Sequence, residues 1–426
     1  MKSLILAIGL VACTDGADRV DPPIDELPAG VWEPAPGAWI WDASLAAENG
    51  TVWWTYIEHR SQPGDSNFDN DVWLAATTAT GQRRIEPSRV DPGDGSIWNP
   101  QVAVTPSAVI VATRGLDSVL RRFDRSGSPL GNPYPIVVDD GGPVETDVRT
   151  IELVATVDGG AQLVAALLSE TAEVAVVDID ATGTPTRTVL VGTPDAMEPG
   201  GSTTSAIAAA PRPDGSTIVA WDRYYNGCIS TRPAATLTAP VTGPTVGAIQ
   251  LVRDMPDRSE ALPAVAAAGS TAYIAWQSGF GNMPLQLAKY PDVATVLAEV
   301  GDANDTNRDV LIALAAPGRG AIAWHADRAG TLNVMAFAES GGTVRFGTPR
   351  VMSAVNTNAP MDSVGLEHVG DDRYVLGWIE GRELTEEERL YATELDFANE
   401  ALRVAPPVET RPLPAVSTTR RRVPCP

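Results

Sequence analysis

A short aliphatic run that ends in a small residue and tryptophan recurs along the chain and constrains the fold more than any other feature. It is clearest at Ile218–Trp221, Tyr273–Trp276, Ala321–Trp324 and Val375–Trp378. Looser copies end at Trp54, Thr113 and Ala166. Successive copies lie 59, 53, 55, 55, 48 and 54 residues apart, which gives seven units that average 54 residues. Such even spacing predicts a repeat architecture.

Each unit also contains the pattern of four short strands. An alternating apolar run precedes the tryptophan segment, as at 100–104 and 263–267, and a third run follows it, as at 119–123. A fourth run comes after another turn, as at 136–138, and the 38 glycines and 35 prolines supply the turns. Four short strands in a repeat of this length are typical of a propeller blade. We therefore predict an all-β fold, a seven-bladed β-propeller with about 54 residues in each four-stranded blade.

The repeated tryptophan has a structural explanation in such a ring. A single four-stranded sheet cannot bury both of its faces, so a large flat side chain in the second strand would wedge between adjacent blades. The units carry neither the WD40 nor the kelch pattern. The segment 91–98 comes nearest to the Ser-x-Asp-x-Gly-x-x-Trp box of sialidases, but it lacks Ser at the first position and Asp at the third. The resemblance to known propellers therefore extends to architecture only.

The amino terminus has the features of an export signal. Met1-Lys2-Ser3 gives a minimal basic start, and the apolar run at 4–11 is too short to span a bilayer as a helix, which needs about 20 residues. The next segment, Leu10-Val11-Ala12-Cys13, resembles the lipobox of bacterial lipoproteins. The resemblance implies a signal peptide at 1–12, lipid attachment at Cys13, and an exported protein anchored in the cell envelope. An ordinary secretory signal with a chance cysteine is the alternative interpretation.

The chain behind Cys13 divides into three parts. Residues 14–36 hold six acidic residues and five prolines, a composition that predicts an extended tether, so we assign 13–36 to a lipid-anchored tether. We expect the propeller at 37–410 and a C-terminal tail at 411–426. The ring has two alternative closures. Either residues 37–42 start the first blade and 401–409 end the seventh, or the segment near Val31 crosses to seal the last blade.

The charge balance excludes several classes of partner. The 54 acidic and 31 basic residues give a net charge of −23, which repels phosphate backbones and anionic lipid headgroups. We therefore expect no nucleic-acid partner, membrane contact through the lipid anchor only, and a monomer. Neither Lys2 nor Lys289 stands in the Gly-Lys-[Ser/Thr] context that a P-loop needs. We expect no cofactor.

Charged residues recur just after the tryptophan position, where the chain enters the loop between the second and third strands. In propellers these loops lie on one common face. Converging arginines in an otherwise acidic protein would form a pocket for a carboxylate or another acidic group. The alternative is that each arginine pairs with a neighbouring Asp or Glu and holds its loop in place. The candidate ligand-binding residues are Arg60, Arg114, Asp222, Arg223, His325, Arg328 and Arg382.

Other patterns of site chemistry are weak. The loops at 65–71 and 302–307 place oxygen ligands at alternate positions, but the first lacks the glycine and glutamate of a calcium loop. We interpret both loops as polar turns and predict no metal site. The histidines His59, His325 and His368 fall in three different units, and no Gly-x-Ser-x-Gly segment is present. We therefore identify no catalytic residues.

The cysteine count fits an exported lipoprotein. Lipid on Cys13 leaves Cys228 and Cys425, which would form a disulfide in an oxidising compartment. Two free thiols, or thiols that pair between molecules, are the alternative.

Without a catalytic pattern, the sequence favours a non-enzymatic propeller for binding or scaffolding, with an unknown protein or glycan as partner. The alternative is a glycan-active or other hydrolytic enzyme on the same fold. An enzyme should hold carboxylates with strongly shifted pKa values around the centre of the ring, whereas a binding protein needs only a complementary surface. The arginine hypothesis requires Arg223, Arg328 and Arg382 to point into a common funnel.

Overall fold

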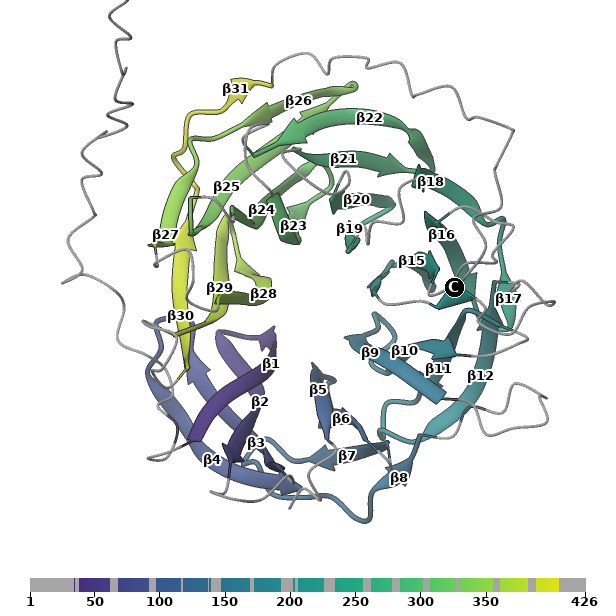
Figure 1. Cartoon of the computed structure of the whole chain (residues 1–426), viewed down its shortest axis with the longest axis vertical. Coiled ribbons are helices and arrows are strands. Elements are labelled where there is room, and N and C mark those ends of the chain that lie inside the picture. Colours follow the sequence, from purple (N-terminus) through teal and green to yellow (C-terminus); the bar gives the residue numbers. More distant parts are fainter. Residues whose placement is uncertain are drawn as a thin grey trace, which may run out of the picture.

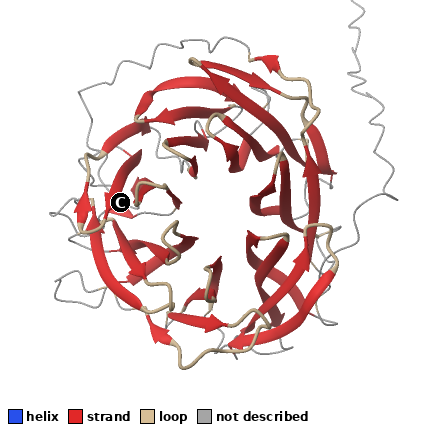
Figure 2. Cartoon of the chain, turned by 180° about the vertical axis from the view of Figure 1, so that it is seen from behind, coloured by secondary structure: helices blue, strands red, loops and turns tan. Residues whose placement is uncertain are grey.

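The structure is a computed structural model of the chain. It describes residues 34, 38–61, 68–91, 97–115, 118–136, 138, 147–168, 172–192, 202–203, 206–225, 234–255, 262–277, 284–301, 307–326, 329–354, 361–381 and 388–405. These residues form strands, turns and loops without a helix (Figure 2). The described part of the chain accordingly contains no helix that could cross a membrane.

Seven small antiparallel sheets surround a common axis (Figure 1). Blade 1 consists of β1 (Ala38–Glu48), β2 (Thr51–Ser61), β3 (Phe68–Thr78) and β4 (Arg83–Asp91). Blade 2 consists of β5 (Trp98–Val104), β6 (Val109–Arg114), β7 (Val119–Phe123) and β8 (Tyr134–Pro135). Blade 3 consists of β9 (Asp147–Ala155), β10 (Ala161–Leu168), β11 (Val174–Ile179) and β12 (Pro185–Val191). In these blades the strands pair in chain order.

Blade 4 consists of β13 (Ser202–Thr203), β14 (Ile207–Pro211), β15 (Ser216–Tyr225), β16 (Ala234–Thr242), β17 (Thr245–Val246) and β18 (Gln250–Met255). Blade 5 consists of β19 (Ala264–Ala268), β20 (Thr271–Gln277), β21 (Leu285–Tyr290) and β22 (Asp292–Val300). Blade 6 consists of β23 (Asn307–Ala316), β24 (Arg319–Ala326), β25 (Thr331–Ser340), β26 (Thr343–Phe346) and β27 (Arg350–Ala354). Blade 7 consists of β28 (Met361–Gly370), β29 (Arg373–Glu380) and β30 (Arg389–Asp396).

The seven-bladed propeller predicted from the repeat is confirmed. The innermost strands are β1, β5, β9, β14, β19, β23 and β28, and the repeated segment forms the second strand of each blade (Figure 1). Some fourth strands differ from the expectation. In blade 2 the fourth strand lies at 134–135 instead of 136–138, and the described residues of blade 7 form three strands.

The hydrophobic core is divided into seven clusters, one at each junction between neighbouring blades. Because side chains alternate along a strand, each second strand contributes to the junctions on both of its sides. Trp276 points to the junction with blade 4, where it shares a cluster with Ala220. Trp324 likewise shares a cluster with Ala275, and Trp378 shares one with Ala323. In each of these pairs the tryptophan of one blade packs against the alanine of the Ala-Trp segment in the blade before it.

Among the described residues, packing and one backbone hydrogen bond join blades 7 and 1. The strands of blade 1 are consecutive from Ala38, which confirms one half of the first closure alternative; Val31 lies outside the described residues. Trp54 of β2 packs on Gly377 of β29, and one backbone hydrogen bond of 3.2 Å joins the Ile40 N–H to the Glu388 carbonyl.

The other half of that alternative, in which residues 401–409 end blade 7, does not hold for the described residues 401–405. The short strand β31 (Arg403–Val404) pairs with β26 of blade 6. The preceding turn explains this path, because Phe397 is buried at the junction of blades 6 and 7. Glu400 then accepts hydrogen bonds from the backbone of Thr348 at 2.8 Å and from Arg350 at 2.7 Å, both in blade 6.

Candidate functional site

Five of the inner strands contain a β-bulge near their first residues. The register of β1 skips Trp41, that of β9 skips Arg149, and that of β28 skips Val364. Similar shifts occur at 98–101 in β5 and 308–311 in β23. A bulge leaves one residue unpaired and re-aims its side chain. We call the face of the ring at which these strands begin the bulge face.

Aromatic side chains gather on this face around the bulge of β1. We call Trp39, Trp41, His59 and Trp98 the tryptophan cluster. Trp41 is 41% exposed although it is large and apolar. Its ring centroid lies 5.2 Å from that of Trp98 in an edge-on arrangement and 4.8 Å from that of His59. Trp39 covers another side of His59 at 4.4 Å. Trp41 is therefore an exposed aromatic surface that is supported from beneath.

His59 is buried under these rings, and Asn70 orients it. The side-chain amide of Asn70 donates to the Ile97 carbonyl at 3.0 Å, so its oxygen faces His59 and accepts a 2.6 Å hydrogen bond from Nδ1. Burial lowers the pKa of His59, while the bond to Asn70 acts in the opposite direction. The imidazole is thus neutral at pH 7 and carries its proton on Nδ1.

A chain of polar contacts links the inner strands of the first three blades beside the cluster. The Asn99 N–H donates to the Asp42 carboxylate at 2.9 Å. The side-chain oxygen of Asn99 then accepts from the Ile151 N–H at 2.6 Å and from Thr150 at 3.0 Å. Asn99 has a φ of +49°, a conformation that asparagine tolerates better than most residues. These bonds hold Trp98 in place under Trp41.

Two glutamates stand on innermost strands deeper in the ring, and we call them the axial glutamates. Glu152 is the third residue after the bulge of β9, and Glu367 is the third residue after the bulge of β28. The two strands lie on facing sides of the axis (Figure 1). Between the bulges and the far ends of the inner strands, the described residues are otherwise mostly alanine, valine, leucine and isoleucine.

Both glutamates resist ionisation. Burial raises the pKa of Glu152 to about 8; an N–H bond from Ala209 opposes the shift, and the charge of Glu367 adds to it. Burial alone raises the pKa of Glu367 to about 7. The two groups titrate as a pair, because the charge on one disfavours the charge on the other. At neutral pH the pair therefore holds at least one proton.

Four of the candidate ligand-binding residues from the sequence have described side chains. Arg60 pairs with Glu58 at 2.6 Å, and Arg114 donates to the Val148 carbonyl at 2.7 Å. Asp222 is buried and accepts from the Ala206 N–H at 2.6 Å, and His325 is buried at the end of β24. Of the two arginines, Arg60 has the acidic neighbour that the alternative requires, whereas Arg114 binds a backbone carbonyl. The side chains of Arg223, Arg328 and Arg382 lie outside the described residues, so the funnel stays a prediction.

Several other predictions also fall outside the described residues. Cys13, Cys228 and Cys425 do, so the lipid site and the disulfide stay predictions. In the 65–71 loop, residues 68–71 belong to β3, and Asp71 forms an ion pair with Arg89. No three His, Cys, Asp or Glu side chains of the described residues converge as a metal site.

Sequence reasoning missed the tryptophan cluster and the two axial glutamates. The two tryptophans Trp39 and Trp41 were a usable signal for an aromatic site. In a regular strand, however, residues two apart lie on the same face, so the pair predicts two side chains with similar surroundings. The bulge separates them, leaving Trp41 exposed. The glutamates are 215 residues apart in sequence, and only the closed ring places their strands across one axis.

No protein-family model matches this chain, and no curated protein matches it. Its fold is similar to solved structures. A protein of unknown function from Dyadobacter fermentans superposes with a TM-score of 0.50 at 10% identity, over 88% of this chain and 97% of the other. The β-propeller domain of the Trilobed protease from Pyrococcus furiosus gives 0.46 at 10% identity over 85% and 99%. An α-L-arabinanase from Penicillium chrysogenum gives 0.45 at 12% identity over 88% and 99%.

The expectation that the chain is not an enzyme is corrected by these comparisons. The similar structures include the arabinanase, a puromycin-hydrolyzing peptidase, prolyl endopeptidases and a microbial sialidase. The expectation rested on the absence of a familiar catalytic pattern in the sequence. That is weak evidence for a propeller, because residues from distant blades meet only around the axis and leave no local pattern. At these identities the likeness itself shows the fold alone.

Proposed function

We propose that this chain is a glycan-active propeller, which binds sugar rings at the tryptophan cluster and hydrolyses a glycosidic bond with the two axial glutamates. The observation that carries the proposal is the placement of Glu152 and Glu367 at equivalent positions of facing inner strands. Glycosidases generally use two carboxyl groups, one on each side of the bond that breaks.

The chemistry follows from the protonation of the pair. The protonated carboxyl would give its proton to the glycosidic oxygen as the bond to the anomeric carbon breaks. The ionised carboxylate would take a proton from the water whose oxygen bonds to that carbon. The raised pKa values support these roles, because a carboxyl of ordinary pKa would hold no proton at pH 7.

The tryptophan cluster supports a sugar as the substrate. One face of a pyranose or furanose ring is lined with C–H groups that pack against an indole, while its hydroxyls need polar partners at the rim. Trp41 offers the exposed indole. The rings of Trp98 and His59 pack against it and keep it from folding down onto the surface of the propeller. An exposed indole that other rings support offers a flat apolar surface to a sugar ring.

Hydrolysis of neutral oligosaccharides tests the proposal. Reducing-end release would be measured with xylo-, arabino-, cello- and malto-oligosaccharides at pH 5 to 8. We expect turnover of at least one series, a raised KM in Trp41→Ala, and a kcat at least 100-fold lower in Glu152→Gln and Glu367→Gln. Leu251→Ala, which removes a 52% exposed apolar side chain from the outer strand β18, is the matched control. Binding without cleavage would refute the hydrolytic half, and neither binding nor cleavage would refute both.

We also propose that the ring is held at a membrane by lipid on Cys13. The lipobox and the acidic, proline-rich segment at 14–36 support this. Cells that express the chain would be labelled with radioactive palmitate, and the labelled protein would partition into detergent. Cys13→Ser should abolish both labelling and membrane association. Equal labelling of the variant would refute the anchor.

A further inference from the structure

The described residues line a groove between blades 3 and 4, on the face opposite the bulge face. Its volume is about 350 Å³, within the range of small-molecule sites. Turns of blade 3 at 156–161 and 178–180 form one wall, and residues 211–217 of blade 4 form the other. No part of the tryptophan cluster belongs to it.

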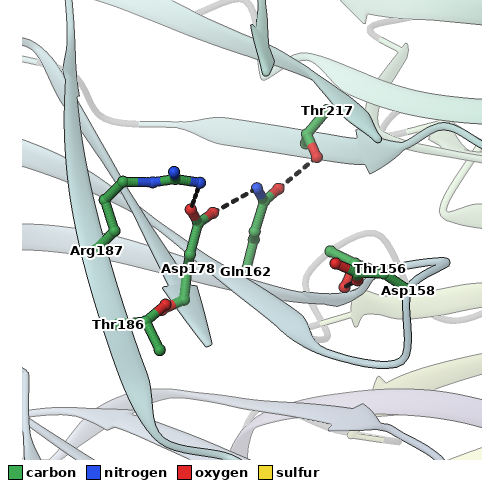
Figure 3. A network of polar contacts seen from close by, with 7 residues as sticks. All are labelled: Thr156, Asp158, Gln162, Asp178, Thr186, Arg187 and Thr217. Atoms are coloured by element: carbon green, nitrogen blue, oxygen red, sulfur yellow. Dashed lines mark hydrogen bonds and ion pairs between the residues drawn. The ribbon is translucent and has the colours of Figure 1, made fainter. Parts of the chain in front are cut away.

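A continuous polar network crosses the floor of the groove (Figure 3). Arg187 of β12 forms an ion pair with Asp178 of β11. The amide of Gln162 in β10 donates to the same carboxylate at 2.8 Å, and its oxygen accepts a hydrogen bond from Thr217 of β15. The network therefore joins the two walls of the groove, through the bond between Gln162 and Thr217.

Two carboxylates at the rim are held in place by their own turns. One oxygen of Asp180 accepts from the Thr182 N–H at 2.8 Å, the Thr182 hydroxyl at 2.7 Å and the Thr184 N–H at 3.0 Å. One oxygen of Asp158 likewise accepts from Thr156 and from the Gly160 N–H. Within the described part of the chain, the second oxygen of each has no hydrogen bond. These bonds lower the pKa of both residues, so both remain pure acceptors at neutral pH.

We propose that this groove is a second glycan-binding site, which takes a neutral segment of two sugar rings. Sugar hydroxyls donate and accept side by side, and the groove offers acceptors in Asp158 and Asp180 and N–H donors in Arg187. The charges favour a neutral ligand. Arg187 is balanced by Asp178 and Arg212 by Asp214, and Arg122 lies close enough to Asp180 to lower its pKa. Asp158 and Asp180 together still leave a net negative rim, which repels anionic sugars.

The site goes beyond the proposed function, since it lies away from both the tryptophan cluster and the axial glutamates. A propeller that cleaves at one face would gain from holding another stretch of the same polysaccharide at the other. Two weak sites on one chain raise the effective concentration of substrate.

The chain contains a matched control for this site. Asp124 forms the same turn in blade 2, with bonds of 2.8, 2.6 and 2.9 Å from the Ser126 N–H, the Ser126 hydroxyl and the Ser128 N–H. It does not line the groove. Asp→Asn keeps an acceptor for the turn but removes the negative charge. Asp180→Asn and Asp124→Asn should therefore change stability alike and differ only in binding.

Calorimetric titration of the full chain carrying Trp41→Ala would isolate the groove from the tryptophan cluster. The probes are cellobiose, maltose, lactose and xylobiose, with glucosamine and glucuronic acid as charged probes. We expect a neutral disaccharide to bind, at least tenfold weaker binding in Asp180→Asn and Arg187→Gln, and no change in Asp124→Asn. Hydrogen exchange of wild-type protein should show slowing at 178–187 with the same disaccharide.

The outcomes separate this inference from the proposed function. Binding that survives Trp41→Ala but not Asp180→Asn supports the groove, whatever the chain hydrolyses. No binding of any neutral disaccharide at the groove overturns it, as does an equal effect of Asp180→Asn and Asp124→Asn. Tighter binding of glucosamine or glucuronic acid than of the disaccharides would overturn the neutral ligand class.

Discussion

The indole of Trp54 lies directly against Gly377, and a β-carbon at that glycine would stand 2.7 Å from the ring. The other three clear copies of the repeat have alanine at this position, and only the last has glycine. The difference falls at the junction where blade 7 meets blade 1. There Trp54 and Leu45 both press on the backbone of blade 7.

Gly377→Ala should therefore weaken ring closure. Overpacking of this kind typically costs about 1 to 3 kcal/mol, because the neighbours must shift. Chemical denaturation monitored by tryptophan fluorescence would measure the loss. Trp54→Phe in the same chain should recover part of it, and the double-mutant cycle gives the coupling. If the two substitutions change the free energy of unfolding additively, the contact between Trp54 and residue 377 is contradicted.

Trp41→Ala should change stability far less than loss of a repeat tryptophan. Trp41 is 41% exposed, whereas Trp276 is 1% exposed and lies in an inter-blade cluster. Removal of a buried tryptophan commonly costs about 3 to 5 kcal/mol. Thermal denaturation of Trp41→Ala and Trp276→Ala side by side would show whether the cluster serves binding rather than folding. Comparable losses would contradict that view.

A buried hydrogen bond between Trp221 and Glu173 crosses the junction of blades 3 and 4. Trp221 donates from Nε1 to the Glu173 carboxylate at 2.7 Å, and both side chains are buried. Glu173→Ala leaves the indole N–H without its acceptor, which should cost about 1 to 3 kcal/mol. Glu173→Gln keeps an acceptor and should lose much less. Equilibrium unfolding would rank the two variants, and the reverse order would refute the role of the bond.

Stability should fall as pH rises from 5 to 8. Glu152 and Glu367 have pKa values of about 8 and about 7 in the folded state, above the ordinary value of 4.5 in the unfolded chain. In this range the folded state binds more protons, so raising the pH favours unfolding. Each unit of pKa difference corresponds to about 1.4 kcal/mol.

Glu152→Gln and Glu367→Gln each replace one titrating carboxyl group with an amide that does not titrate. Both variants should match the wild type near pH 5 and exceed its Tm near pH 8, as scanning calorimetry would record. The lowered pKa of His59 acts in the opposite direction on the wild type and on both variants, so the comparison between them decides. A pH dependence of Tm that is the same in the variants as in the wild type would show that the two glutamates ionise normally. The turn aspartates do not confuse the result, since the pKa values of Asp124 and Asp180 are lowered and they titrate below this window.

The amino-acid sequence by itself determined the number of blades and the place of the tryptophans. Both follow from local patterns, because a run of apolar residues between turns specifies a strand wherever it lies. The Ala-Trp pair also determines how it packs. Side chains alternate along a strand, so the alanine and the tryptophan point to the junctions on opposite sides of the blade. No long-range information was needed for these features.

Only the tertiary structure decided where chemistry can occur. A bulge adds one residue to one strand, and its effect depends on the register of pairing, which the order of residues does not display. It turns Trp41 outward and sets Glu152 and Glu367 at equivalent depths on facing strands. The raised pKa values of the glutamates exist only after the ring closes, because burial and the charge of a distant residue produce them.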